Sequence, residues 1–318
     1  MKKSTYIVLI LVYATCSGVN AEELIFIEAN TERGFHYPFF LFIPDSVESD
    51  TESFIVIEPN NSGFADDDFQ KHLESSKKNA SRDFYLGNYV ARKLKYPLIV
   101  PVFPRRKSQW EIYTHALDKD VILQKENSLE RIDLQLIEMF NDARSRLKEK
   151  QIETKDQFLL TGFSASGTFV NRFTLIHPDR VFAVAAGGVN GLLIIPKDSI
   201  NNEALNYPIG TNDFKELFKK DFQKDLFKNT PQFYFMGQND ENDAIPYADG
   251  YDDNERELVY KLIGKEMQPK RWNHCQEIYR NLGVNATLKT YEGFGHEFPK
   301  NIKEEILQFF KQSIEEQE

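Results

Sequence analysis

The repeated alternation of short apolar runs with longer amphipathic stretches constrains the fold of this sequence more than any other feature. The apolar runs are rich in β-branched and aromatic residues, as strands are, and the stretches between them have apolar residues at helical spacing. The strand-like runs cover residues 23–29, 36–46, 53–59, 96–104, 157–162, 181–188, 231–237 and 285–293. The helix-like stretches cover residues 84–94, 129–150, 165–177, 254–282 and 303–312. The first two strand-like runs read as an antiparallel pair. The whole order predicts an α/β fold, with a mostly parallel central sheet of about eight strands covered by helices on both faces.

One segment interrupts this alternation. Residues 192–230 are polar and irregular between two strand-like runs. We interpret them as a small lid-like insertion over the sheet. No internal repeat, Gly/Ser-rich linker or composition shift divides the rest of the chain, so we expect one domain over residues 22–318.

The first 21 residues have the pattern of a signal peptide. A pair of lysines precedes the apolar run Tyr6–Tyr13, and small and polar residues follow up to Ala21. The run is too short to span a bilayer, so we expect cleavage after Ala21 and no membrane span in the mature chain. This pattern predicts a secreted or periplasmic protein. Cys16 leaves a lipoprotein open as an alternative, although Thr15 before it fits that signal poorly.

The charge of the chain argues against a nucleic-acid partner. The net charge is −10, and it becomes −12 without residues 1–21, which hold two lysines and no acidic residue. Phosphate contacts require clustered cations, which an acidic chain lacks. Cys275 would be the only cysteine after cleavage, so no intrachain disulfide can form, which a bacterial periplasm permits. The sequence shows neither metal-ligand spacing nor a phosphate-binding glycine-rich loop, so we expect no metal and no cofactor.

The chemistry is carried first by a serine on a tight turn between a strand and a helix. The stretch "LLTGFSASGTF" begins as a strand, turns within a few small residues, and continues as a helix. Such a turn strains the backbone of its central residue and needs small neighbours on either side. Ser164 follows Gly162 by two residues, and the amide of Ala165 opens the helix, where it would stabilise an oxyanion. Ser166 stands where a second glycine is usual, with Gly167 next. Ser164 is therefore the candidate nucleophile, Ser166 is its competitor, and helix capping by both serines is the alternative.

A nucleophilic serine needs a histidine base and an acid that orients it. His296 lies in "YEGFGHEF", on a glycine-flanked loop directly after the last strand-like run. Such a loop lies at the carboxyl edge of a parallel sheet, where α/β folds bind ligands. Asp240 follows the strand-like run "QFYFMG" closely and is the candidate acid, with Asp243 as its competitor. The order serine, acid, histidine is that of the α/β-hydrolase triad.

These motifs resemble the α/β-hydrolase superfamily over essentially the whole mature chain. They are similar to motifs of secreted esterases and polyhydroxybutyrate-depolymerase-like enzymes, with feruloyl- and acetyl-esterase relatives. The similar stretches are the serine turn and following helix "GFSASGTFVNRFTLIHPDRV", the strand and turn "FYFMGQND" and the histidine loop "GFGHEFP". The resemblance implies the α/β-hydrolase fold and a serine esterase. It also implies a second oxyanion donor from the loop "EPNNSG", where the common His-Gly pair is missing and Asn61 or Ser62 would donate.

The loop "WEIYTHALDKD" supplies two further candidates. Trp110 and His115 would line the substrate pocket, or they would anchor the loop by packing and hydrogen bonding. The leading hypothesis is a serine hydrolase whose partner is a small-molecule or polymeric ester. Two alternatives remain open: a small serine peptidase of the prolyl-oligopeptidase type, which shares fold and triad, and a catalytically inactive hydrolase-like binding protein.

Overall fold

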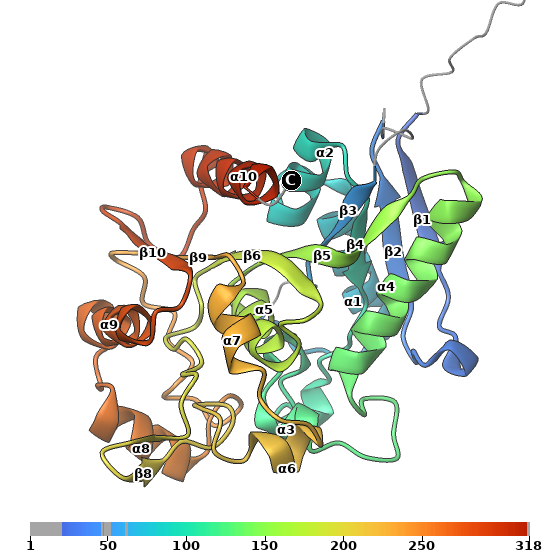
Figure 1. The fold of residues 1–318 in the computed structure, drawn as a ribbon. Helices are drawn as coiled ribbons and strands as arrows, with labels where there is room; N and C mark the ends of the chain where they lie inside the picture. The colour runs from blue at the N-terminus through green and yellow to red at the C-terminus, as the bar shows by residue number, and fades with distance from the viewer. Residues whose placement is uncertain (1–20, 46, 48–51, 61–62, 317–318) are drawn as a thin grey trace, which may run out of the picture.

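A central sheet of eight strands organises the chain (Figure 1). The computed structural model describes residues 21–45, 47, 52–60 and 63–316. The strands lie in the order β1-β2-β4-β3-β5-β6-β9-β10, with β1, β2 and β4 paired antiparallel and the remaining neighbours paired parallel. The predicted α/β class, the antiparallel opening pair and the mostly parallel sheet of about eight strands are therefore confirmed.

The elements have the following bounds. The strands of the central sheet are β1 (Glu23–Ile27), β2 (Phe39–Ile43), β3 (Ser53–Ile57), β4 (Leu98–Pro101), β5 (Thr154–Phe163), β6 (Val181–Gly187), β9 (Gln232–Gly237) and β10 (Ala286–Tyr291). The helices are α1 (Phe69–Ser81), α2 (Leu86–Leu94), α3 (Lys119–Ile122), α4 (Ile132–Glu149), α5 (Ala165–Ile176), α6 (Phe214–Phe218), α7 (Lys224–Asn229), α8 (Asp253–Leu262), α9 (Trp272–Leu282) and α10 (Lys300–Glu315). Short helical turns lie at η1 (Thr31–Arg33), η2 (Lys107–Gln109), η3 (Thr114–Ala116) and η4 (Met267–Arg271), and β7 (Ser199–Ile200) pairs with β8 (Glu203–Ala204) in a small hairpin.

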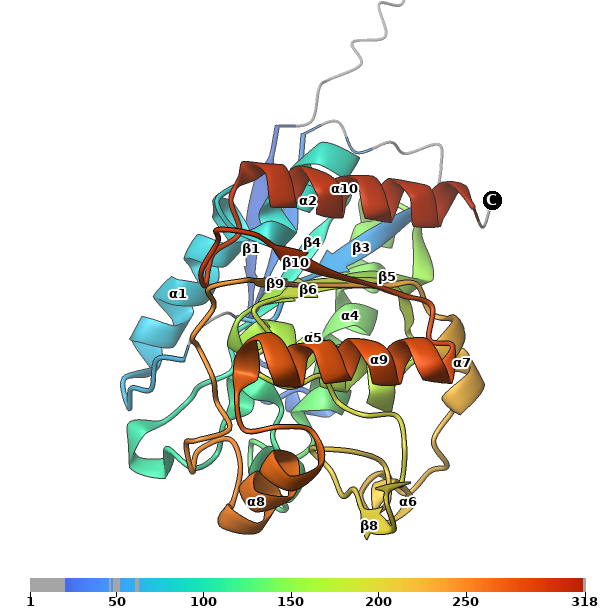
Figure 2. The same ribbon diagram turned by 90° about the vertical axis from the view of Figure 1, so that its left-hand side faces the viewer.

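Helices cover both faces of the sheet, as Figures 1 and 2 show: α1, α2 and α10 lie on one face, and α4, α5 and α9 lie on the other. Side chains along a strand alternate between the two faces. On β3, Ile55 and Ile57 therefore join the core beneath α4 and α5, whereas Phe54 and Val56 join the core beneath α2 and α10. Both faces of the central strands are buried, which explains why their sequences are continuously apolar rather than alternating.

The segment that the sequence marks as an insertion packs along the outer side of α5 and α9. Tyr279 of α9 donates to Ile194 O at 2.8 Å, and Ile194 N donates to Asn171 Oδ1 of α5 at 2.8 Å. The hairpin β7–β8 and helices α6 and α7 follow, on the side of the sheet where α5 lies (Figure 1). The structure thus shows this segment as an additional layer on that face, and its role as a lid stays a prediction.

The structure corrects one sequence expectation, and another falls outside the described residues. The long helical stretch 254–282 is wrong as a single unit, because Gly264 at φ 136° and Pro269 separate α8 from α9. The predicted signal peptide 1–21 lies outside the described residues except for Ala21. Within residues 21–45, 47, 52–60 and 63–316, every helix is too short or too polar to cross a membrane.

Candidate active site

Ser164 occupies a strained turn at the carboxyl end of β5. The strand ends at Phe163 and α5 begins at Ala165, so Ser164 alone joins them. Its backbone has φ 62° and ψ −128°, a region that residues other than glycine rarely adopt. The Ser164 N–H donates to Gly187 O of β6 at 3.0 Å, which ties the turn to the neighbouring strand. The sequence pattern of small residues therefore corresponds to a tight strand–helix junction.

The small residues around this turn have separate packing reasons. A Cβ on Gly162 would lie 2.5 Å from Ser166 O, and a Cβ on Gly167 would lie 2.5 Å from Gly187 O. Ser166 is fully buried, and its hydroxyl accepts from Phe163 N and donates to Phe163 O, both at 2.9 Å. The Ser166 hydroxyl is thus used entirely within the turn, whereas the Ser164 side chain is partly exposed.

His296 and Asp240 form a hydrogen-bonded pair on two neighbouring loops. His296 Nδ1 lies 2.9 Å from Asp240 Oδ2. Asp240 is 3% exposed and its other oxygen, Oδ1, accepts from Asn242 N at 2.9 Å. The imidazole packs against the ring of Phe163, whose centroid lies 4.6 Å away, so it stands directly beside the serine turn. The structure therefore brings Ser164, Asp240 and His296 together.

Asn242 bridges the nucleophile candidate and the histidine, and the sequence analysis missed it. Its Nδ2 lies 2.9 Å from His296 Nε2 and donates to Ser164 Oγ at 3.3 Å. Ser164 Oγ in turn donates to Asn190 Oδ1 at 3.5 Å. Within the part of the chain that the structure describes, no hydrogen bond joins Ser164 Oγ to His296 Nε2 directly. The one sequence signal was proximity, because Asn242 follows the acid by two residues.

Asp243, the competing acid, serves a different purpose. It forms an ion pair with Arg271, which is fully buried and also donates to Gly191 O at 2.7 Å. Asp243 Oδ1 accepts from Ile245 N at 3.0 Å. These contacts hold the loop after β9 against the protein, and they leave Asp240 as the acid that faces the histidine.

The structure describes one of the three residues proposed as oxyanion donors. Ala165 opens α5, so its N–H is one of those that a helix leaves without an internal acceptor. Asn61 and Ser62 lie outside the described residues, but both of their neighbours are anchored. Asn60 Nδ2 donates to Phe103 O at 2.9 Å, and Gly63 O accepts from the guanidinium of Arg105.

Arg105 connects the loops that surround the serine. It is 4% exposed and forms an ion pair with Asp249 at 2.5 Å, on the loop that carries the acid. Its guanidinium carbon lies 3.6 Å from the centroid of the Tyr113 ring. Tyr113 in turn packs with Ala116 against Ala165. The sequence analysis did not single out Arg105, because a basic run such as "RRK" is typical of solvated surface.

The two predicted pocket residues differ in placement. Trp110 is 45% exposed. His115 is 1% exposed, and its Nε2 lies 2.8 Å from both Phe103 O and Asn60 Nδ2. These contacts give His115 the anchoring role that the sequence left open, beside the loop of the oxyanion candidates. Tyr113, which the sequence analysis did not single out, is the side chain of this loop that packs on Ala165.

Burial perturbs two acidic groups near these loops. Glu58 directly follows β3 and accepts from Gly87 N at 2.8 Å, and burial raises its pKa to about 8. Asp118 accepts from Tyr113 N at 3.1 Å and Val121 N at 2.9 Å, and burial raises its pKa to about 7. The hydrogen bonds of both carboxyls go to backbone amides and not to Ser164 or His296. Both groups are therefore structural supports of the loops around the site.

A second acid–histidine pair shows what the site requires beyond proximity. His177 Nε2 lies 2.8 Å from Asp133 Oδ2, and Arg131 also donates to Asp133. Burial lowers the pKa of His177 and outweighs the opposing effect of Asp133. This pair is enclosed, with His177 3% exposed, and it lies at the far end of α5 from Ser164. Among the described residues, no three His, Cys, Asp or Glu side chains are placed to share a metal ion.

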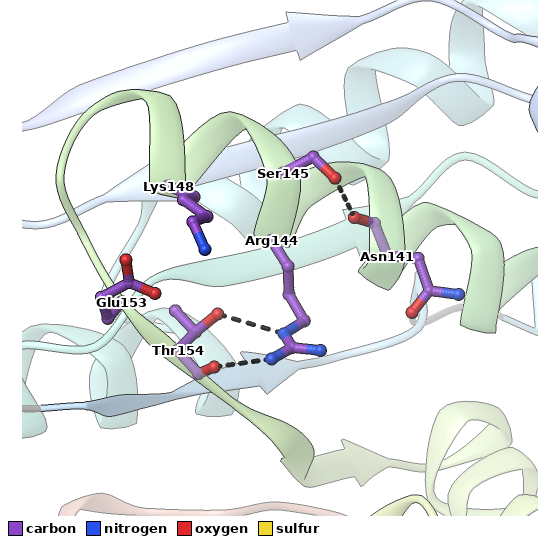
Figure 3. Close-up of a pocket in the computed structure, with 6 residues that line it drawn as sticks. All are labelled: Asn141, Arg144, Ser145, Lys148, Glu153 and Thr154. Atoms are coloured by element: carbon purple, nitrogen blue, oxygen red, sulfur yellow. Dashed lines mark hydrogen bonds between the residues drawn. The ribbon is translucent and has the colours of Figure 1, made fainter.

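A surface pocket of about 350 Å³ lies away from these residues (Figure 3). Arg144 of α4 donates across it to Thr154 Oγ1 at 3.3 Å and to Thr154 O at 2.8 Å. Thr154 is the first residue of β5 and Ser164 follows the last, so a 10-residue strand of about 30 Å separates the pocket from the serine. The pocket is therefore distinct from the candidate active site.

Comparison with known proteins supports the fold. No protein-family model and no curated protein matches the chain. Among solved structures, a poly(aspartic acid) hydrolase-1 from Sphingomonas is similar with a TM-score of 0.57 at 15% identity, covering 92% of this chain and 97% of that one. A poly(3-hydroxybutyrate) depolymerase from Bordetella parapertussis has a TM-score of 0.55 at 17% identity, covering 92% and 89%. An S-formylglutathione hydrolase from Agrobacterium tumefaciens has a TM-score of 0.51 at 12% identity, covering 92% and 94%.

At these low sequence identities, the structural similarity establishes the fold and does not establish an activity or a substrate. Together with the strand order and the helices on both faces, it shows that the chain has the α/β-hydrolase fold. The resemblance inferred from the sequence motifs is confirmed at that level.

Proposed function

We propose that this protein is a serine hydrolase that cleaves a carboxylic ester through Ser164, His296 and Asp240. The observation that carries the proposal is the hydrogen bond between buried Asp240 and His296, beside a serine held at φ 62° on a strand–helix turn. A serine in this setting is exposed above the sheet while its base is oriented by a carboxylate, as nucleophilic catalysis requires. Similar folds named as hydrolases and a depolymerase are consistent with this chemistry.

The reaction follows from the roles of these groups. Ser164 Oγ attacks the ester carbonyl carbon while His296 Nε2 accepts the hydroxyl proton. Asp240 keeps the imidazole in the tautomer with Nδ1 protonated and stabilises the cation that forms. The tetrahedral intermediate collapses to an acyl-serine as His296 returns the proton to the leaving alcohol. Water then attacks the acyl-serine, giving up its proton to His296, and the carboxylic acid leaves as Ser164 regains the proton.

The developing oxyanion requires donors placed before the reaction. The N–H of Ala165 is one, because it follows the serine and opens α5. We assign the second to Asn61 or Ser62, whose loop is held by Asn60 on one side and by the Arg105 contact to Gly63 on the other.

We also propose that the protein is exported, on the basis of the N-terminal pattern. Mass spectrometry of protein from its native host should find the mature chain beginning at Glu22. A chain that begins at Met1 contradicts export, and a lipid on Cys16 supports the lipoprotein instead.

A substrate panel tests the reaction and separates it from the alternatives. p-Nitrophenyl esters of increasing acyl length are assayed beside peptide p-nitroanilides, with Ser164→Ala as the inactive variant and the exposed Ser145→Ala as the matched control. We expect ester turnover in the wild type and in Ser145→Ala, and background rates in Ser164→Ala. Turnover of peptides alone would replace the esterase by a peptidase. Absence of both activities would favour a binding protein.

A further inference from the structure

The side chain of Asn242 occupies the space between the proposed nucleophile and its base. Its Nδ2 contacts His296 Nε2 at 2.9 Å and Ser164 Oγ at 3.3 Å. Asn242 is exposed, and it comes from the loop after β9, which also carries Asp240. The contact is therefore made by a side chain that has room to move.

The proton positions follow from the partners of each group. The Asp240 carboxylate only accepts, so His296 Nδ1 carries the proton that it shares with Oδ2. A neutral imidazole then has a lone pair on Nε2, which requires a donor, and the amide nitrogen of Asn242 supplies one. Ser164 Oγ accepts the other N–H of this amide and directs its own proton to Asn190 Oδ1 at 3.5 Å. In this arrangement the serine proton points away from the base.

Proton transfer requires a different arrangement. His296 Nε2 must accept the hydroxyl proton of Ser164, and the leaving oxygen of a substrate must then lie within reach of the same nitrogen. The Asn242 amide fills this position. Its backbone is held by the bond from Asn242 N to Asp240 Oδ1 at 2.9 Å, so rotation of the side chain alone would clear the site without disturbing the acid.

We propose that Asn242 is a positioning residue that holds Ser164 and His296 apart in the free protein and swings aside when substrate enters. This inference rests on the proposed serine-hydrolase function. It gives the protein a nucleophile that reacts slowly with small reagents until an occupant of the leaving-group position displaces the amide.

The expected change in the reactivity of Ser164 follows from the two hydrogen bonds that the Asn242 side chain loses when it swings aside. Two exposed hydrogen bonds favour the blocked arrangement by about tenfold in an equilibrium constant. The apparent reactivity falls with the fraction of open sites, so removing the amide should raise it by about the same factor.

The test measures the rate at which a small fluorophosphonate labels Ser164. In this reaction Ser164 Oγ bonds to phosphorus, fluoride leaves, and the serine proton passes to His296. Asn242→Ala removes the amide. Asn242→Asp keeps its shape but places a carboxylate on Nε2, where it favours the protonated ring, which cannot act as a base. Asn239→Ala, an exposed asparagine of the same loop, is the matched control.

We expect labelling about tenfold faster in Asn242→Ala, slower in Asn242→Asp, and unchanged in Asn239→Ala. A merely structural role for Asn242 would move the first two variants in the same direction, so opposite shifts distinguish the two roles. Labelling of Ser164 in Asn242→Ala at or below the wild-type rate overturns the proposal but leaves the serine hydrolase intact. Absence of labelling in both the wild type and Asn242→Ala overturns the proposed function as well.

Discussion

Replacing Ser166 by glycine tests how the serine turn is built. Backbone groups of successive residues in β5 point alternately to β6 and to β3. Ser164 N donates to β6, so Phe163 N and O point to the β3 side, where the pairing of β3 with β5 has already ended. The Ser166 hydroxyl satisfies both Phe163 groups, where no strand remains to do so. Its removal leaves buried backbone groups unpaired, at about 1–3 kcal/mol. Glycine in a helix adds about 0.5–1 kcal/mol. We expect Ser166→Gly to lose about 1.5–4 kcal/mol of unfolding free energy, which a domain with an unfolding free energy of about 5–15 kcal/mol survives.

Urea unfolding measures this loss, and covalent labelling of the folded variant measures whether the nucleophile persists. Ser166→Ala separates the hydroxyl from the glycine effect and should lie above Ser166→Gly by about 0.5–1 kcal/mol. Ser145→Gly, on the exposed side of α4, supplies the cost of glycine alone. A Ser166→Gly variant as stable as Ser145→Gly would refute the anchoring of Phe163 by this hydroxyl. Loss of labelling in folded Ser166→Gly would refute a purely structural role for Ser166.

Four further substitutions probe the site and its supports. Asp240→Asn should lower ester turnover by about ten-thousandfold. Asp243→Asn should retain most of the turnover but cost about 3–5 kcal/mol of stability, because its buried arginine partner is left unpaired. If kinetic assays show the larger loss of turnover in Asp243→Asn, the triad acid is Asp243. Glu58→Gln tests a buried carboxyl whose pKa is raised from 4.5 to about 8. The unfolded chain ionises first, so the wild type should lose stability relative to the variant from about pH 4.5 to pH 8, by on the order of 5 kcal/mol, and parallel stability curves would contradict this. Arg105→Met should lower kcat by about a hundredfold with a smaller change in KM, because the loop of the oxyanion donors loses its anchor while Asp249 loses its partner; a change in KM alone would argue against that role.

The features that the sequence predicted correctly are those written in local patterns. Continuous apolar runs such as β3 and β6 identify buried parallel strands, and glycine and small residues between a strand and a helix identify the tight turn at Ser164. Chain order then placed Asp240 and His296 on loops at one edge of the sheet, where the structure brings them together. These inferences needed only the periodicity of elements and the rule that parallel strands end at a common edge.

The features that the sequence did not show depend on contacts between distant residues. Arg105 lies in a basic run that is typical of surface, and its burial follows only from its pairing with Asp249 across the fold. The bridge made by Asn242 depends on a side-chain direction that no spacing encodes. His115 presented two interpretations because an aromatic loop at a sheet edge serves a pocket or its own packing equally well; only its burial separates them.

The proposed role of Ser164 as the nucleophile is tested by locating a covalent adduct on the protein. Folded protein is treated with a fluorophosphonate, digested, and the modified peptide is sequenced by mass spectrometry. We expect an adduct on Ser164 that is lost in both Ser164→Ala and His296→Ala. An adduct on Ser166, or labelling that persists in Ser164→Ala, would contradict it.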